Sequence, residues 1–313
     1  MIRPAQRAAS YGMQFALGSI SASARPALGA PHSSLGSFRL LSSMRECTVE
    51  ALQGTDAGIY VLTLDRPTAK NALGRNLLAQ FRESINQMHF DEKVRVVIVK
   101  SAVDGVFCAG ADLKVSLAVS LSWNAPEMEQ TEVASFVHSL RASFSELEAL
   151  PMPTIAAIDG FALGGGLELA LGTDLRVAGS KAKVGLPETR LAIIPGAGGT
   201  QRLPRLIGAS RAKELIFTSR LLSSNEALDY GIVNYAVEGL AYPKALELAR
   251  LMVPNGPVAL RMAKLAVNQG SQLDLASGLA FEKTCYAQVI PTQDRLEGLA
   301  AFREKRAPVY TGR

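Results

Sequence analysis

Two glutamates and two glycine-rich turns lie close together in the middle of the chain. Glu168 follows three glycines at 164–166, and Glu188 comes twenty residues later, shortly before the glycine-rich stretch 196–199. Glycines let backbone N–H groups approach a ligand closely, and the start of a helix adds partial positive charge. A carboxylate one turn into such a helix can act on whatever those N–H groups hold. The pattern therefore predicts an active site within residues 159–200.

Proton transfer beside a carbonyl group is the chemistry that suits these residues. Two backbone N–H groups would hold the carbonyl oxygen and stabilise the enolate that develops. Paired carboxylates would deliver and remove a proton, or activate a water. Taken singly, Glu168 could be an ordinary residue near the favourable end of a helix dipole, and Glu188 a solvated acid at a strand end. Their combination with two glycine turns and the turn at 109–111 favours function.

Other classes of site find less support in the sequence. A Ser–His–Asp triad would need His89 or His138, and neither lies in a motif. Cys108 lies at an apolar strand end without a basic neighbour to lower its pKa, which favours packing over nucleophilic catalysis. The stretch from Gly196 lacks the last glycine of GxGxxG, and no GK[ST] occurs, so Rossmann and P-loop sites are excluded. The three scattered cysteines argue against disulfides and a structural metal, and for a reducing compartment.

The elements that must position these residues alternate between strand and helix. Residues 59–64, 94–99 and 154–158 are predicted strands, and the β-branched run at 94–99 is typical of a strand buried on both faces. A helix is expected to open at Lys70 and Asn71, with apolar residues at helical spacing up to residue 85. Further helices are expected at 129–150, 258–269, 273–288 and 292–306. The simplest division is an α/β core at 46–253 followed by a helical C-terminal region at 254–313.

The basic charge of the chain comes from its first 45 residues. This segment is rich in Ser and Ala and contains five arginines but no Asp, Glu or Lys: Arg3, Arg7, Arg25, Arg39 and Arg45. Beyond it the basic and acidic residues balance. An Arg- and Ser-rich, acid-free N-terminus is typical of a mitochondrial transit peptide. We therefore expect residues 1–45 to be a disordered transit peptide that is removed on import, although a tail of no consequence has the same composition.

Composition sets two further limits. The chain has 313 residues, of which 48% are apolar and 19% charged, as expected for a globular protein with a sizeable core. Its apolar runs are broken well before the roughly 20 residues that a membrane span needs. The stretch 115–125 is apolar and Ser-rich and shows no firm period. We expect it to form an irregular loop or lid.

Three segments resemble the enoyl-CoA hydratase (crotonase) superfamily, in the order found there. They are residues 107–114 (FCAGADLK), 158–168 (IDGFALGGGLE) and 195–204 (PGAGGTQRLP), and the similarity runs from about residue 48 to the C-terminus. The resemblance implies a spiral of ββα units and a helical C-terminal region that makes a homotrimer, usually paired as a hexamer. It implies hydration of 2-enoyl-CoA thioesters in the mitochondrial matrix, in fatty-acid or branched-chain amino-acid breakdown. No separate cofactor is implied, because CoA is part of the substrate.

The resemblance also places functional roles on individual residues of this chain. It implies that Glu168 and Glu188 are the catalytic acids, that the N–H groups of Ala111 and Gly165 form the oxyanion hole, and that Gly196 positions the water. Contacts to substrate or CoA are implied for six residues of the same chain: Ala69, Ala72, Ala109, Gly110, Asp112 and Gly164. A neighbouring subunit would add Tyr286, Phe302 and Lys305. The apolar stretch 115–125 replaces a charged helix of the family at the acyl-pocket wall, so it is expected to set chain-length preference.

Two alternatives belong to other functional classes. An AU-binding member of the family suggests RNA binding through cations on its second helix, but residues 84–100 offer only Lys93, Arg95 and Lys100. A neutral body releases few counterions, so RNA binding is expected to be weak and salt-sensitive. The second alternative is an acyl-CoA-binding scaffold in which the altered stretch 115–125 leaves low activity.

Overall fold

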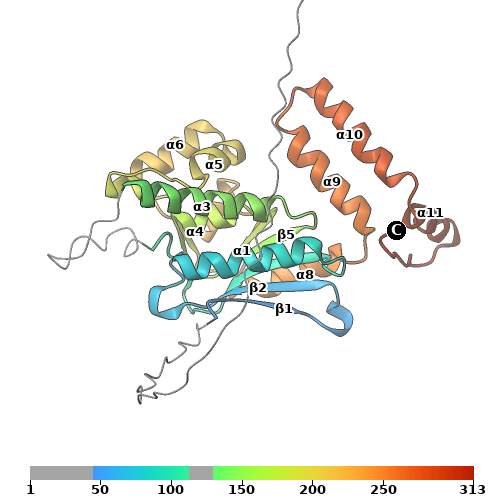
Figure 1. Cartoon of the computed structure of the whole chain (residues 1–313), viewed down its shortest axis with the longest axis horizontal. Helices are drawn as coiled ribbons and strands as arrows, with labels where there is room; N and C mark the ends of the chain where they lie inside the picture. The colour runs from blue at the N-terminus through green and yellow to red at the C-terminus, as the bar shows by residue number, and fades with distance from the viewer. Residues whose placement is uncertain (1–44, 113–129) are drawn as a thin grey trace, which may run out of the picture. The chain divides into compact units, whose positions relative to one another are not determined.

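The structure is a computed structural model that describes residues 45–112 and 130–313 (Figure 1). The expected transit peptide, except for Arg45, and the expected lid at 115–125 lie outside the described residues. Among the described residues, six strands form one sheet in the order β1-β2-β3-β5-β7-β10, and four form a second in the order β4-β6-β8-β9. The first sheet contains Cys47–Ala51 (β1), Ile59–Leu64 (β2), Val96–Ser101 (β3), Thr154–Ile158 (β5), Leu175–Ala178 (β7) and Tyr235–Ala236 (β10).

The smaller sheet is built from strands that directly follow strands of the larger one. It contains Val106–Cys108 (β4), Phe161–Leu163 (β6), Lys183–Gly185 (β8) and Leu222–Ser223 (β9). In each of the pairs β3–β4, β5–β6 and β7–β8, the first strand joins the large sheet and the second joins the small one. Pairing is parallel except for β1 with β2 and β8 with β9. This repeated ββα winding confirms the predicted fold class.

Helices follow the strand pairs and then make up the C-terminal part of the chain. They are Arg75–Phe90 (α1), Gln130–Glu148 (α3), Gly165–Leu171 (α4), Gly199–Ile207 (α5), Ala209–Thr218 (α6), Ser224–Asp229 (α7), Tyr242–Met252 (α8), Pro257–Gly270 (α9), Leu275–Val289 (α10) and Gln293–Glu304 (α11). Three short 3-10 helices are Gly54–Asp56 (η1), Pro67–Ala69 (η2) and Glu188–Leu191 (η3). Within the described ranges no helix is long and apolar enough to span a bilayer.

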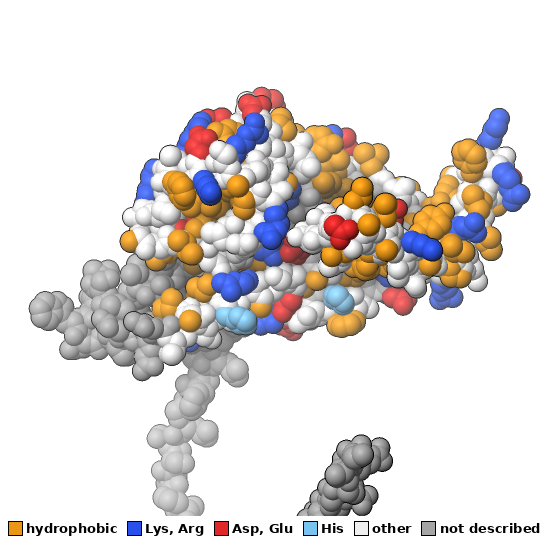
Figure 2. Space-filling model, turned by 90° about the horizontal axis from the view of Figure 1, so that it is seen from above, with side chains coloured by type: hydrophobic (Ala, Val, Ile, Leu, Met, Phe, Trp, Pro, Cys, Tyr) orange, Lys and Arg blue, Asp and Glu red, His pale blue; other side chains and the backbone are white. Residues whose placement is uncertain are grey.

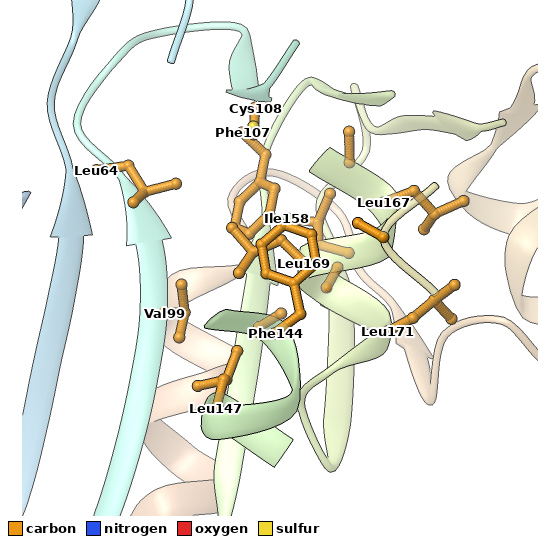
Figure 3. Packing of buried hydrophobic residues seen from close by; sticks show 14 of the residues in the cluster. Leu64, Val99, Phe107, Cys108, Phe144, Leu147, Ile158, Leu167, Leu169 and Leu171 are labelled. Atoms are coloured by element: carbon orange, nitrogen blue, oxygen red, sulfur yellow. The ribbon is translucent and has the colours of Figure 1, made fainter. Parts of the chain in front are cut away.

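Strand β3 is buried on both faces, as its β-branched run predicts, although it begins two residues later than expected. Val97 and Val99 belong to a core shared with α1, α3 and α4, whereas Val96 and Ile98 belong to a core shared with α8. Figure 3 shows Val99 in the first core beside Phe144 and other residues of α3 and α4. Because side chains alternate along a strand, one strand supplies both cores. The large sheet therefore forms the middle layer that carries α4.

The expected helix start at Lys70 and Asn71 is wrong. Both residues have left-handed backbone conformations, with φ of 52° and 53°, and α1 begins at Arg75. The buried Asn71 side chain accepts from Arg66 N at 2.7 Å and donates to Phe107 O at 3.1 Å. Asn tolerates this backbone region better than most residues. Asn71 therefore closes a turn that brings residues 70–73 against the end of β4.

The C-terminal helices join the core through a few polar contacts and expose many apolar side chains. Lys264 of α9 pairs with Asp174 at 2.8 Å and donates to Met152 O. The exposed apolar residues of this region are Leu265, Val267, Leu273, Leu275, Leu279, Tyr286, Ile290, Leu296, Leu299 and Phe302. Figure 2 shows hydrophobic side chains on the surface at the right of the view, the side on which these helices lie in Figure 1.

Candidate active site

Two chain segments that are far apart in sequence are paired beside the first glycine turn. Leu73 N donates to Gly110 O at 2.8 Å, and Asp112 N donates to Leu73 O at 3.1 Å. Leu73 and Ala111 thus form a parallel bridge in which Leu73 makes both hydrogen bonds. In such a bridge the N–H of the opposite residue points to the other side. The N–H of Ala111 is therefore directed away from Leu73.

The glycines at 164–166 allow this segment to approach the start of α4. A Cβ atom added to Gly166 would lie 2.2 Å from the carbonyl oxygen of Cys108, and one added to Gly165 would lie 3.3 Å from Ala111 N. Gly165 is the first residue of α4, where N–H groups have no acceptor within the helix. The structure therefore brings the Ala111 and Gly165 backbones together, as the sequence interpretation requires.

Glu168 is buried one turn into α4, and its side chain is 3% exposed. Its Oε1 atom accepts hydrogen bonds from Ala197 N at 2.8 Å and from Gly199 N at 2.7 Å. Burial raises the pKa of Glu168 above its usual value, and these two N–H groups and the charges of Arg202 and Arg141 oppose the increase. The second glycine stretch therefore supplies the N–H donors that bind this carboxylate.

Glu188 begins η3 and lies against the first glycine turn. A Cβ atom added to Gly164 would lie 2.9 Å from Glu188 Oε1, so a side chain at this position would displace the acid. Among the described residues, the buried Oε2 atom has no hydrogen-bond partner. Burial, with a smaller contribution from the charge of Glu168, raises the pKa of Glu188 to about 7. The two acids thus differ in their surroundings. Two backbone N–H groups stabilise the Glu168 carboxylate, whereas burial of Glu188 favours its protonated form.

The residues expected to contact CoA fall into two groups. Ala69, Ala72, Ala109 and Gly110 lie on the paired segments, where Ala109 N donates to Lys70 O at 3.1 Å. Tyr286 lies on α10 and Phe302 on α11, with 63% and 85% of their surface exposed, and Lys305 is the exposed residue that ends α11. The structure brings the first group to the glycine turn at 164–166 and leaves the second group on the surface of the single chain.

Arg66 is a supporting residue that the sequence interpretation missed. Its Nη1 atom donates to Asp112 Oδ2 and to Ala72 O, both at 2.7 Å, and its Nε lies 3.2 Å from Glu46. The buried Asp112 carboxylate is therefore engaged with Arg66, a role not foreseen from the sequence. No local pattern distinguishes Arg66, which precedes Pro67 at the end of a strand.

The remaining candidate chemistries are not assembled in the described part of the chain. No group of three or more His, Cys, Asp and Glu residues in those ranges could hold a metal ion. The thiol of Cys108 is fully enclosed and donates to Asn71 O at 3.1 Å. Burial raises its pKa to about 12, so the reactive thiolate is not formed near neutral pH. Cys108 is a packing residue.

Comparison with known proteins identifies the family. The family model described as enoyl-CoA hydratase/isomerase matches residues 54–313, and the chain belongs to this family. It is 51% identical over 292 residues to human mitochondrial methylglutaconyl-CoA hydratase, covering 92% of this chain and 84% of the relative. It is 52% identical over 273 residues to mouse mitochondrial enoyl-CoA hydratase domain-containing protein 2, covering 86% and 89%. The resemblance drawn from the three motifs is confirmed.

A solved structure agrees with the fold. The crystal structure of enoyl-CoA hydratase from Bacillus anthracis matches with a TM-score of 0.80 and 45% identity, covering 86% of this chain and all of that one. These relatives carry the names of hydratases, which are lyases. The chain thus combines this fold, the glycine turns and the two acids, and its relatives are named as enzymes that add water to CoA thioesters.

The close packing at Gly166 generates a stability prediction. Gly166→Ala places a methyl group against the Cys108 carbonyl, so the backbone must shift, and such overpacking costs about 1–3 kcal/mol. Thermal unfolding is expected to show a lower Tm. The matched control is Gly270→Ala at the end of α9, whose added Cβ comes no closer than 3.9 Å to Gly278 and which is expected to melt no lower than the parent. Equal Tm values for the two variants would contradict the packing argument.

Proposed function

We propose that this protein adds water across the double bond of 2-enoyl-CoA thioesters to give 3-hydroxyacyl-CoA. The observation that carries the proposal is the contrast between two acids at the same pair of glycine turns. Glu168 has two backbone donors that favour its ionised form, whereas burial raises the pKa of Glu188 to about 7 and favours its protonated form. Acids of unlike pKa are suited to act as base and acid in one reaction.

In the proposed reaction, the thioester oxygen binds the N–H groups of Ala111 and Gly165. Glu168 takes a proton from a water held near Gly196, and the water oxygen forms a bond to C3. The electron pair of the double bond moves toward the thioester, and the two N–H groups stabilise the negative charge on its oxygen. Glu188 then gives its proton to C2, which completes the addition of water.

The relatives support a class of substrate and a location. The human relative is named a methylglutaconyl-CoA hydratase, and both it and the mouse relative are named mitochondrial. We therefore propose an enoyl-CoA of fatty-acid or branched-chain amino-acid breakdown as substrate, and the mitochondrial matrix as location. The acid-free composition of residues 1–45 supports the same compartment. The stretch 115–125 is proposed to set the acyl preference.

The described cations offer little support for RNA binding. Arg95 donates to Val253 O and Asn255 O, and the Lys100 ammonium lies 4.5 Å from the centre of the Tyr242 ring. Only Lys93 of the three is exposed. A site with so few available cations would make few phosphate contacts, and these contacts supply most of the affinity for nucleic acid. An acyl-CoA-binding scaffold remains the alternative outcome of the activity tests.

The first test replaces each acid without changing its size. Glu168→Gln and Glu188→Gln keep hydrogen-bonding capacity but remove the titrating group, so each is expected to lower kcat roughly 10²–10⁴-fold, with smaller effects on thioester binding. The assay follows loss of enoyl absorbance from a short 2-enoyl-CoA. Hydration at the parental rate by both variants would show that the mechanism is wrong. A parent that binds CoA thioesters without turning them over would favour the scaffold.

The pKa of Glu188 predicts how the rate depends on pH. Because Glu188 must be protonated to donate to C2, kcat/KM is expected to fall as pH rises through about 7. Because Glu168 must be ionised to accept a proton, kcat/KM is expected to fall on the acid side as well. The measurement is kcat/KM from about pH 5 to pH 9 at constant ionic strength. A kcat/KM that keeps increasing with pH across this whole range would contradict the assignment of Glu188 as the acid.

The exposed apolar helices lead us to propose a homotrimer or a hexamer of two trimers, in which Tyr286, Phe302 and Lys305 reach the CoA of a neighbouring chain. Sedimentation velocity is expected to show one of these assemblies. The double variant Leu296→Asp with Leu299→Asp charges two exposed positions of α11 and is expected to sediment as a smaller species.

The matched control for the assembly test is Leu251→Asp on α8, which is 65% exposed and precedes the C-terminal helices. It is expected to keep the size of the parent assembly. A fully active parent that sediments as a monomer would overturn the proposed assembly.

A further inference from the structure

One peptide group joins an arginine on the outer face of α3 to the buried carboxylate on α4. The carbonyl oxygen of Gly196 accepts two hydrogen bonds from Arg141, from Nε at 3.2 Å and from Nη2 at 2.9 Å. The N–H at the other end of the same peptide, that of Ala197, donates to Glu168 Oε1 at 2.8 Å. Because a peptide group is planar and rigid, fixing its oxygen also fixes the direction of its N–H.

The next two peptide groups each make one of these two kinds of contact. Gly199 N donates to the same Oε1 atom at 2.7 Å, and Arg202 donates to Ala197 O at 3.1 Å. Gly198 between them has φ of 116°, a backbone conformation that L side chains rarely adopt. The stretch 196–199 thus turns N–H groups toward Glu168 and presents two of its carbonyl oxygens to arginines.

The charges around Glu168 come from three different elements. Arg141 on α3 and Arg202 on α5 each lower the pKa of Glu168. The charge of Glu168 in turn raises the pKa of Glu188 in η3. Arg202 has the larger effect of the two on this pKa and is also paired with Glu148 at 2.7 Å. Among the described residues, Arg141 donates hydrogen bonds only to Gly196 O. Hydrogen bonds in a chain polarise one another, so the cation strengthens the Ala197 donor as well.

We propose that Arg141 is a positioning residue for Glu168, acting through the peptide between Gly196 and Ala197. This inference rests on the proposed function, in which Glu168 accepts a proton from water. Within the described ranges, the side-chain hydrogen bonds of Glu168 both go to Oε1, and we assign Oε2 to that water. Arg141 holds the carboxylate in this orientation and favours its ionised form.

The position of Arg141 separates this role from a structural one. Arg141 is an exposed residue of α3, whereas α3 is anchored in the core by other residues: Phe136, Leu140, Phe144 and Leu147. Replacing an exposed side chain away from the core usually changes stability little. We therefore expect an Arg141 variant to fold like the parent while its Glu168 behaves differently.

The test compares Arg141→Met, Arg141→Lys and the control Arg205→Met. Arg205 is an exposed arginine of α5 that donates to a backbone carbonyl, Gln201 O at 2.9 Å, but not to the stretch 196–199. Arg141→Met is expected to lower kcat about tenfold with little change in KM, because a small misplacement of a catalytic group is costly. The decrease of kcat/KM on the acid side of the pH profile, here called the acid limb, is expected to move to higher pH in Arg141→Met. Removing a positive charge raises the pKa of Glu168.

Arg141→Lys separates charge from geometry. It keeps the cation, so the acid limb is expected to stay near the parental position, but it lacks the planar fork that binds one oxygen twice, so kcat stays reduced. Arg205→Met is expected to match the parent in both measurements. Parental kcat and an unmoved acid limb in Arg141→Met, or a lower Tm as its only defect, would overturn the inference.

A measurement without turnover keeps the two proposals apart. The carboxyl group of Glu168 is titrated by infrared spectroscopy of protein labelled with ¹³C-glutamate, and its band is assigned by its loss in Glu168→Gln. Its pKa is expected to be higher in Arg141→Met than in the parent, whether or not the parent hydrates an enoyl-CoA. A parent without hydratase activity would overturn the proposed function alone. An unchanged or lower pKa of Glu168 in Arg141→Met would overturn the positioning inference alone.

Discussion

A buried carboxylate held by two backbone N–H groups is the constraint on which the rest of the structure depends. A charge removed from water is costly unless hydrogen bonds replace its hydration. Glu168 meets this requirement through Ala197 and Gly199, which lie some thirty residues further along the chain. The second glycine stretch must therefore fold against α4. In turn, α4 must be buried along its whole length, which requires a sheet on one side and α3 on another.

The alternation of strands between two sheets provides that burial. Each strand pair sends the chain from the large sheet to the small one, and the turns at the ends of β4 and β6 meet where Gly166 packs on the Cys108 carbonyl. Only a residue without a side chain allows this approach. The same packing brings the backbones of Ala111 and Gly165 together. Site and core therefore share one set of contacts, and the glycines serve both.

Much of this arrangement could be predicted from the sequence, because the signals are local. The β-branched run of β3 and the glycines before Glu168 depend on nearby residues alone, and the predicted limits of α9–α11 lie within two residues of the observed ones. The turn at Asn71 was mispredicted, because its left-handed backbone is stabilised by Phe107, a distant partner. Arg66 and Arg141 were missed for the same reason. Nothing in the sequence near either arginine marks it, because its partner, Asp112 for Arg66 and Gly196 O for Arg141, is distant in the chain.

The stretch proposed to set acyl preference and the two glutamates occupy separate parts of the chain. Residues 113–129 follow β4 and Asp112 and precede Gln130, the first residue of α3, so they come before either glutamate in the chain. Insertions and deletions between these two points leave the register of β5 with β3 and of β6 with β4 untouched. Such changes also preserve the spacing between the acids. An evolving lineage can therefore vary the length of this one connection without changing the number of residues between the two glutamates.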